Sequence, residues 1–536
     1  MHSNWITILP PIIVLAVAIF RRNVIMALLT GIVSAAFIAS DFSIINSIKL
    51  IFNKIIEQLH IKNLYYGIAP DHLYTFGFLI ILGILISLIT LSGGIAAYSK
   101  KLETRLKTKK NVEFASIILS SLFFIDDYLN SLMVGCIARP ITDKFKIPRA
   151  KLAFLLDAMS PTMCVLVPAS SWIALILSQL ENSGVNQYIN QNSLIIADPF
   201  NVYVNSILYM FYPIILIIST LFIINNRISF GPMKKHELIA EKENNLFGLK
   251  EAIGIDTDCQ PKVGSILDFV LPISIFLIGT VLILLYSGNW LIFGGDQSFI
   301  KAILSGNPFL SLFASSLISL IVTIIYLYSG NKLTNTELKI AIVSGFNLMK
   351  NSLIVLLLAW TLGAILKEDL KTGNYLAGLL SNSFPGFLIP LIIFLASLIV
   401  SSSTGSAWGT IAIIMPLAIP IVVKFSGHSA PIILSQAKLV YSILGALISG
   451  AIAGGHVSPI SDATVMASTS AGSYHLDHLI TQIAYVIPVI ISCSISLIAT
   501  GLLTNYNQLI ALPVSLILGI TSSLTMLYVI NKIQKN

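Results

Sequence analysis

Long apolar runs dominate this chain and constrain its fold more than any other feature. Several of them reach about 18 residues or more, and short loops that carry basic residues separate them. A run of this length crosses the hydrocarbon core of a bilayer as a helix, which satisfies its own backbone hydrogen bonds. Of the 536 residues, 56% are hydrophobic and only 10% are charged, which excludes a soluble domain. The sequence predicts an all-α, polytopic membrane protein.

Charge and cysteine content indicate which partners and cofactors this membrane protein is expected to have. The net charge of +8 comes from loops between apolar runs, where basic residues mark the cytoplasmic side, so the lipid bilayer and not nucleic acid is the expected partner. The first apolar run, Trp5–Phe20, lacks a basic leader and is expected to remain as a helix rather than act as a signal peptide. No cofactor is predicted. The cysteines have no metal or redox spacing and are expected to be ordinary thiols: Cys136, Cys164, Cys259 and Cys493.

The first part of the chain has a definite order of predicted elements. They are spans at Trp5–Phe20, Asn23–Ser40 and Tyr74–Tyr98, an interfacial helix at Ile44–Leu59, a segment at Val112–Ala138, a span at Leu152–Leu180 broken at Ser160-Pro161 and at Pro168, and a span at Ser206–Ile224. Basic loops flank Val112–Ala138 on both sides, at Lys100–Lys110 and Arg139–Lys151, so both ends belong on the cytoplasmic side. A re-entrant hairpin meets that condition, with Asp126 and Asp127 near its tip, and a kinked single span is the alternative.

The second part repeats this order in the opposite orientation. Its elements are spans at Ile266–Tyr286 and Pro308–Tyr328, an amphipathic piece at Thr336–Lys350, a span at Leu353–Leu366, a hairpin at Phe387–Phe425 broken at Ser401–Ser406, a broken span at Ile432–Gly472, and spans at Ile483–Leu503 and Leu509–Ile530. Inverted repeats with re-entrant hairpins and broken transmembrane helices are typical of secondary transporters. We predict a first repeat at 1–226, a cytoplasmic linker at 227–265, a second, inverted repeat at 266–503 and an extra C-terminal helix at 504–536.

The clearest interruption lies within Gly445–Gly472. Paired glycines at 454–455 and a proline, Pro459, are expected to open the helix and to expose carbonyl and amide groups. An ionisable residue, Asp462, follows the break. Unwound backbone and a carboxylate at membrane depth indicate an ion or substrate site. A proline kink with a satisfied polar cluster is the structural alternative.

Acidic residues lie near the tip of the first predicted hairpin and beside both predicted broken spans. Asp126 and Asp127 are adjacent in apolar surroundings, so their mutual repulsion favours a proton or a cation between them. Asp157 and Asp462 flank the two broken spans, although an aspartate can also simply cap a half-helix. Hard cations such as sodium prefer oxygen ligands, and hydroxyl groups gather at the same breaks. The hydroxyl residues at these breaks are Ser160, Thr162, Thr404, Ser406, Ser458, Ser461 and Thr464.

Histidines fall in and after the second break. His456 lies inside the break, where it either titrates near physiological pH or stays neutral as a structural residue. His475 and His478 follow the break and are expected at the cytoplasmic face. The chain has no GxxxxGK[ST] phosphate loop, so ATP-driven transport by this chain is not predicted, and no enzyme activity is expected.

Several motifs resemble the signatures of the NhaC-type sodium/proton antiporter family, over about residues 111–482 and in the family's order. They are FIDDYLNSLMVG (Phe124–Gly135), RPITDKFKIPRAKLAFLLD (Arg139–Asp157), STGSAWGTIAIIMPLAIP (Ser403–Pro420), SPISDATVMAS (Ser458–Ser468) and the tail His475–Gln482. The resemblance implies cation–proton exchange, with relatives that carry amino acids or carboxylates such as malate and lactate. It places the family's acidic pair on Asp126 and Asp127, with Asn130 one turn on, and its first broken-span acid on Asp157.

One position departs from the family in a way that bears on function. Where the family commonly has an acid before the histidine, this chain has Gly455, so ion stoichiometry and the identity of the cargo stay open. We predict a secondary transporter of the inner or plasma membrane that exchanges sodium ions for protons, with a homodimer allowed. The alternative is a sodium- or proton-coupled carrier of a small organic acid or amino acid. A membrane sensor is disfavoured because it would not need acids at both breaks.

Overall fold

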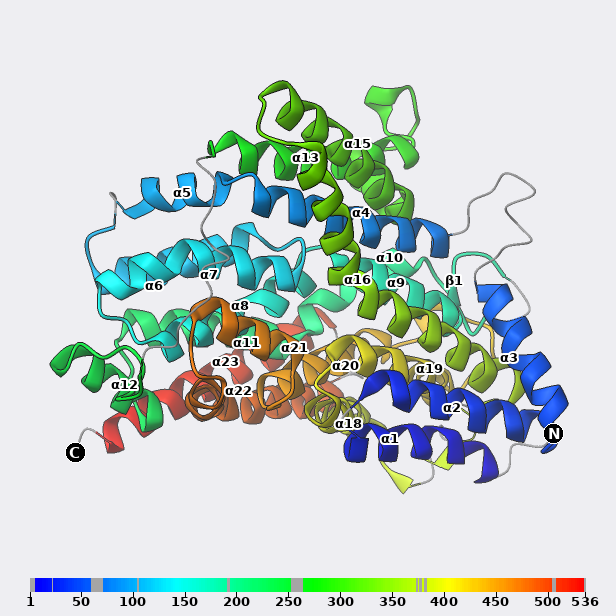
Figure 1. Cartoon of the computed structure of the whole chain (residues 1–536). Coiled ribbons are helices and arrows are strands. Elements are labelled where there is room, and N and C mark those ends of the chain that lie inside the picture. Colours follow the sequence, from blue (N-terminus) through cyan, green and yellow to red (C-terminus); the bar gives the residue numbers. More distant parts are fainter. Residues whose placement is uncertain are drawn as a thin grey trace.

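The structure is a computed structural model of the chain. It describes residues 5–534 except 22, 59–70, 104–105, 190–192, 252–263, 373–374, 376–377, 380–382 and 504–507. Helices make up nearly all of it (Figure 1). Within the described residues, eight helices are long and apolar enough to cross a membrane, and two bent pairs raise the number to ten if each pair is one span. The prediction of an all-α, multi-pass membrane protein is confirmed.

Comparable sets of helices precede the hairpin in each part of the chain. The first set is α1 (Leu9–Arg21), α2 (Val24–Ala39), α3 (Ile44–Gln58), α4 (Asp71–Leu91) and α5 (Gly94–Glu103), and the second is α13 (Leu267–Ser287), α14 (Phe299–Ser305), α15 (Pro308–Ser329) and α16 (Asn335–Ala364). The predicted division between an amphipathic piece and a separate span is wrong, because α16 is one helix of 30 residues. A capping box between Thr334 and Glu337 begins it, and no proline interrupts the sequence that follows.

The first hairpin consists of α6 (Lys109–Leu122) and α7 (Asp127–Lys144). The two arms contact each other, and the turn between them contains Asp126. The start of α6 and the end of α7 meet at one face of the protein, where Val112, Ile141 and Ile147 form a small hydrophobic cluster. A single crossing would place these segments at opposite faces. The predicted re-entrant hairpin is therefore confirmed.

The second hairpin consists of α18 (Ile389–Thr404) and α19 (Ala407–Ser426). Its turn falls within the predicted break, at Gly405 and Ser406. Gly405 has φ +72°, a left-handed conformation that glycine adopts without steric cost. Ser406 caps α19, because its Oγ accepts a hydrogen bond from Gly409 N at 3.1 Å.

Each hairpin is followed by a broken helix. In the first part α8 (Arg149–Leu166) and α9 (Ser171–Asn182) meet at an angle of 52°. In the second part α20 (Val440–His456) is followed by α21 (Asp462–Ala471). The breaks at 167–170 and 457–461 contain Pro168 and Pro459, as expected.

The two other predicted breaks are wrong. Pro161 lies inside α8, and Gly454 and Gly455 lie in the last turn of α20. Helix α8 continues because the carbonyl that Pro161 leaves without a partner, that of Asp157, faces His456 Nε2 at 3.0 Å. The glycine at 454 lets helices pack closely, since a Cβ there would overlap with Leu398 O on α18.

The remaining helices pack around the two hairpins and the two broken helices. They are α10 (Pro199–Ser206), α11 (Phe211–Asn225), α12 (Gly231–Lys242), α22 (His475–Leu503) and α23 (Gln508–Ile533). Nearly every residue of α8, α9, α19 and α20 is buried, so these four helices form the core of the protein. By contrast, α13 and α23 expose large apolar side chains, as expected of helices that face lipid.

Two features mark opposite faces of the protein. A small parallel sheet in the order β1 (Val185–Asn186), β2 (Ile195–Ile196), β3 (Ile432–Ile433) joins the segment after α9 to the segment after α19. At the other face α12 pairs with the start of α8 through Glu237 and Lys151. Figure 1 shows α12 and β1 far apart, with α8 on the side of α12 and α9 on the side of β1. The hairpins thus enter from opposite faces, as in an inverted repeat, while the boundaries at 226, 265 and 503 stay predictions.

Candidate functional site

A cavity of about 430 Å³ lies where the two hairpin tips meet the break between α20 and α21. Three helices begin at its wall: α7, α19 and α21. Further residues come from α8, α9 and α16. Five of the residues predicted from the sequence line it: Asp127, Ser406, His456, Ser461 and Asp462.

Two carboxylates face this cavity from opposite halves of the chain. Asp127 is the first residue of α7 and is buried, and its Oδ1 has no hydrogen-bond partner among the described residues. Asp462 is the first residue of α21 and is exposed. Tyr128 joins the two elements, because its hydroxyl donates to Asp462 Oδ2 at 3.3 Å. Each acid is the first residue of a helix that begins at the cavity, Asp127 in the first hairpin and Asp462 after the second break.

Helix ends and indole groups supply the positive side of the cavity. The partial positive charge of a helix N-terminus stabilises nearby anions, including the two carboxylates. Trp172 on α9 and Trp408 on α19 also line the cavity, with ring centroids 6.3 Å apart. Each indole Nε1 is buried and makes no hydrogen bond within the described part of the chain. The cavity therefore offers both anionic oxygens and N–H donors.

The backbone at the second break is tied to the tip of the second hairpin. The amide of Asp462 donates to Gly405 O at 3.1 Å. Ser458 holds the turn, since its Oγ accepts a hydrogen bond from Ile460 N at 3.3 Å. The hydroxyl of Thr404 contacts the backbone of Ser406 at 3.2 Å. Ser458 and Thr404 thus shape the backbone and are absent from the cavity wall.

The remaining residues of the first hairpin also have local partners. Asp126 Oδ2 accepts a hydrogen bond from Ser171 Oγ at 2.8 Å, which links the tip to the start of α9. Asn130 Nδ2 donates to Ser120 O at 2.7 Å and joins α7 to α6. Ser160 Oγ donates to the carbonyl oxygen of Asp127. All of these side chains are buried and support Asp127 rather than line the cavity.

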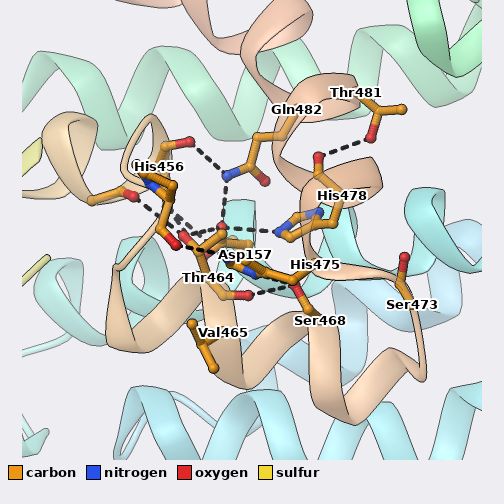
Figure 2. Close-up of polar contacts among 12 residues, drawn as sticks. Asp157, His456, Thr464, Val465, Ser468, Ser473, His475, His478, Thr481 and Gln482 are labelled. Atoms are coloured by element: carbon orange, nitrogen blue, oxygen red, sulfur yellow. Dashed lines mark hydrogen bonds and ion pairs between the residues drawn. The ribbon is translucent and has the colours of Figure 1, made fainter.

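Asp157 lies outside the cavity wall, at the centre of a separate buried cluster (Figure 2). Its Oδ2 accepts hydrogen bonds from Thr464 Oγ1 at 2.8 Å and from Gln482 Nε2 at 2.6 Å. His478 Nε2 lies 3.2 Å from the same oxygen. These partners come from α21 and α22, so the cluster joins α8 of the first half to the second half.

His456 connects this cluster with the cavity. Its Nε2 faces the carbonyl oxygen of Asp157 at 3.0 Å, and its Nδ1 lies 2.8 Å from the hydroxyl of Tyr212. A carbonyl oxygen can only accept, so Nε2 carries a proton and Tyr212 donates to Nδ1 in the neutral ring. His456 also lines the cavity and is therefore the residue shared by both clusters.

Sequence reasoning missed several residues of these clusters. His478 was expected at the cytoplasmic face but is fully buried against Asp157. A signal for it exists, because His478 and Gln482 are four residues apart and share one face of α22. Tyr128 and Trp172 had no such signal, since only the folded chain brings them to Asp127 and Asp462.

The sequence is similar to a known protein family and to individual known proteins. A model of the Na+/H+ antiporter family matches residues 163–502. An uncharacterized protein of Haemophilus influenzae is 30% identical over 505 residues, 93% of this chain and 91% of that protein. The malate-2H(+)/Na(+)-lactate antiporter of Bacillus subtilis is 30% identical over 200 residues, 36% of this chain and 37% of its own.

Two solved transporter structures are also similar. The Alcanivorax borkumensis YdaH transporter aligns over 83% of this chain and 90% of its own, with a TM-score of 0.46 and 14% identity. Neisseria gonorrhoeae MtrF aligns over 82% of this chain and 84% of its own, with a TM-score of 0.36 and 13% identity.

Proposed function

The chain belongs to the Na+/H+ antiporter family, and from this premise we propose that it exchanges sodium ions for protons across the cytoplasmic membrane. Family and multi-pass helical fold make it a secondary transporter. The choice of sodium and proton as cargo is the proposal, and it rests on the two carboxylates of the cavity.

The pairing of Asp127 with Asp462 is the observation that carries the proposal. Sodium is a hard cation that prefers oxygen ligands, and these two acids present carboxylate oxygens to one cavity. Ser406 and Ser461 line the same cavity and add hydroxyl oxygens. Because Asp127 Oδ1 lacks a hydrogen-bond partner among the described residues, it is available to a cation. Exchange then requires that the protein release a proton as the cation binds.

The hairpins supply the two gates in this mechanism. Their tips meet at the cavity, and they enter from opposite faces of the protein. Movement of the first hairpin opens the cavity toward the face of α12, and movement of the second opens it toward the sheet. Alternating access between two such states is the general mechanism of inverted-repeat transporters.

The size of the cavity favours a second candidate function, coupled transport of a small carboxylate. About 430 Å³ far exceeds the volume of a sodium ion and falls in the range of small-molecule pockets, about 300–1,000 Å³. The helix N-termini and the unpaired indole groups of Trp172 and Trp408 suit a carboxylate group. The similarity to a malate/lactate antiporter points to the same class of cargo.

Purified protein in proteoliposomes tests both candidates. A sodium gradient is imposed with a pH dye inside, first without organic solute and then with malate, lactate or an amino acid. Proton movement that needs only sodium supports antiport, and movement that strictly needs a solute supports the second candidate. Absence of coupled transport under every condition contradicts both.

Variants of the two acids test the site. Asp127→Asn and Asp462→Asn keep side-chain size and remove the charge, and each should lower exchange by about tenfold or more, which corresponds to about 1.4 kcal/mol of lost cation binding. Asp296→Asn is the matched control, because Asp296 is exposed in the loop between α13 and α15. Wild-type exchange rates in both well-folded variants would show that the ion binds elsewhere.

A further inference from the structure

The buried cluster around Asp157 contains two histidines and is separate from the cavity wall except at His456. We call Asp157, His456, Thr464, His478 and Gln482 the Asp157 centre. All five side chains are buried, with relative exposure of 0% or 1%. A carboxylate at such depth is costly unless hydrogen bonds or a positive charge compensate it. The question is which member of the centre can hold that charge.

The two oxygens of Asp157 have different surroundings. Three side-chain nitrogen or hydroxyl groups point at Oδ2 (Figure 2), whereas Oδ1 makes no hydrogen bond within the described residues. His456 Nε2 lies 3.9 Å from Oδ1. Since that nitrogen already faces the carbonyl oxygen of Asp157, it does not satisfy the carboxylate.

The two histidines differ in whether they can accept a proton in place. Both ring nitrogens of His456 are occupied, one by the Asp157 carbonyl and the other by Tyr212. In His478, Nε2 must donate to Asp157 Oδ2, because an ionised carboxylate only accepts. Its Nδ1 then carries a free lone pair and has no partner among the described residues. A proton can be added there without breaking an existing hydrogen bond.

We infer that His478 is the proton-carrying residue of the transport cycle, with its proton on Nδ1 and the resulting imidazolium paired with Asp157. The inference rests on the proposed exchange function and adds a proton site apart from the cation-binding cavity. Protonation adds one positive charge and breaks no covalent bond. The product is a buried ion pair of zero net charge, so the carboxylate itself stabilises the loaded state.

The neighbouring charged groups leave Asp157 as the partner of His478. Among the helices packed against α22, α20 contributes His456 and α11 contributes Tyr212, and these two side chains are hydrogen-bonded to each other. Helix α12 contributes Glu237, which pairs with Lys151, and His236. On α22 itself, Asp477 pairs with Lys250 at 2.7 Å and His475 bonds Ser468 at 3.0 Å. Within the described part of the chain, the carboxylate that His478 contacts is therefore that of Asp157, at 3.2 Å.

Two contacts would transmit the state of His478 to the cavity. Thr464 bonds Asp157 and lies two residues after Asp462, so a change at Asp157 acts on the start of α21. His456 contacts the Asp157 carbonyl and lines the cavity. A positive charge at His478 also repels a sodium ion in the nearby cavity, which favours binding of one cation at a time.

The first test separates proton coupling from sodium binding. In proteoliposomes, His478→Gln keeps an amide N–H donor for Asp157 but cannot take up a proton. The ratio of sodium-driven proton flux to radioactive sodium self-exchange should fall by about tenfold or more. His428→Gln is the control, because His428 is an exposed histidine after α19. An unchanged ratio in His478→Gln would overturn the inference, whereas absent sodium-dependent flux in the wild type would overturn the proposed function.

The second test uses binding in detergent and the other partner of the pair. Calorimetric titration with sodium in two buffers of different ionisation enthalpy measures protons released per ion bound. Release should be present in wild type and lost in Asp157→Asn, because a neutral amide does not stabilise the imidazolium. Wild-type proton release in Asp157→Asn overturns the inference even if His478→Gln does not fold.

Discussion

Pro161 ties the two halves of the chain together through the backbone carbonyl that it leaves without a helical partner. Pro161 cannot donate to the carbonyl of Asp157, and His456 does so from the other half. In the second break, the carbonyl of Gly455 accepts hydrogen bonds from Ser458 N at 3.1 Å and from Thr464 Oγ1 at 3.2 Å. A residue type that usually ends a helix thus creates, at Asp157, an acceptor for a side chain of the Asp157 centre.

Gly455 is the residue at which a substitution should change ion binding. A Cβ there would lie 3.4 Å from Ser461 Oγ, an ordinary contact, so a side chain fits. Gly455→Asp adds a carboxylate to the cavity, and at about 4–6 Å and an effective dielectric near 20 one charge contributes about 3–4 kcal/mol before desolvation. We expect apparent sodium affinity, measured by transport at varied sodium concentration, to tighten by about tenfold.

Two further variants control for the backbone at this position. Gly455→Asn adds similar bulk without charge and should leave sodium affinity near that of the wild type. Gly454→Ala should reduce the amount of folded protein, because its methyl group would overlap with Leu398 O. Equal sodium dependence in wild type and folded Gly455→Asp protein would contradict the charge argument and favour an organic cargo.

At the residue scale, the sequence predicts which residues belong to the candidate site better than it predicts which of them lie together. Asp127, Ser406, Ser461 and Asp462 were identified because acids and hydroxyls next to helix breakers are unusual in an apolar run. Which of the acids share a cavity depends on contacts between residues over 300 positions apart, such as Tyr128 with Asp462. No local pattern contains that information.

At the scale of elements, the tip of the second hairpin is constrained both by its backbone conformation and by its contact with the second break. Gly405 has a left-handed backbone, and a methyl group there would overlap with the carbonyl oxygen of Ile460 in the break. Gly427, which ends α19, has nearly the same φ, but a Cβ at that position would meet nothing within 4 Å among the described residues. Comparing Gly405 with Gly427 therefore separates two costs of adding a side chain: the left-handed backbone conformation, which both share, and the overlap with the break, which only Gly405 has.

Alanine substitutions at these two glycines measure that contact. Gly427→Ala should cost about 1–2 kcal/mol from its left-handed backbone alone. Gly405→Ala should cost a further 1–3 kcal/mol or so from overlap with Ile460. Thermal unfolding in detergent should place the midpoint of Gly405→Ala clearly below that of Gly427→Ala. Equal midpoints would mean that the hairpin tip does not pack on the break.

Elements with strong signals were predicted well, and breaks were predicted less well. The hairpins followed from basic residues on both flanks and from a hydroxyl-rich turn, and both are present. The break at Pro168 was predicted, but a further break at Pro161 was predicted wrongly, because a sequence does not reveal that a distant histidine will replace the lost hydrogen bond. Likewise the polar stretch of α16 was separated from its apolar stretch, although nothing in the backbone divides them.

At the scale of the whole molecule, charge and the small sheet define two different faces. At one face, Lys151 with Glu237 joins the start of α8 to α12, and Lys250 with Asp477 joins the segment after α12 to the start of α22. The sheet joins the segments after α9 and α19 at the other. Basic residues concentrate at the first face, so we predict that this face is the cytoplasmic one. Both halves reach the central cavity from these two faces.

Single-cysteine labelling with an impermeant thiol reagent tests this arrangement. Lys107 and Lys146 are exposed residues on either side of the first hairpin, and Tyr188 and His428 are exposed near the sheet. In a background without the four native cysteines, Lys107→Cys and Lys146→Cys should react only after the membrane is permeabilised, because both lie at the cytoplasmic face. Tyr188→Cys and His428→Cys should react in intact cells. If Lys107→Cys and Lys146→Cys are labelled from different sides, α6 and α7 form a single crossing and not a hairpin. The two hairpins could then not enter from opposite faces, and the inverted repeat would be wrong.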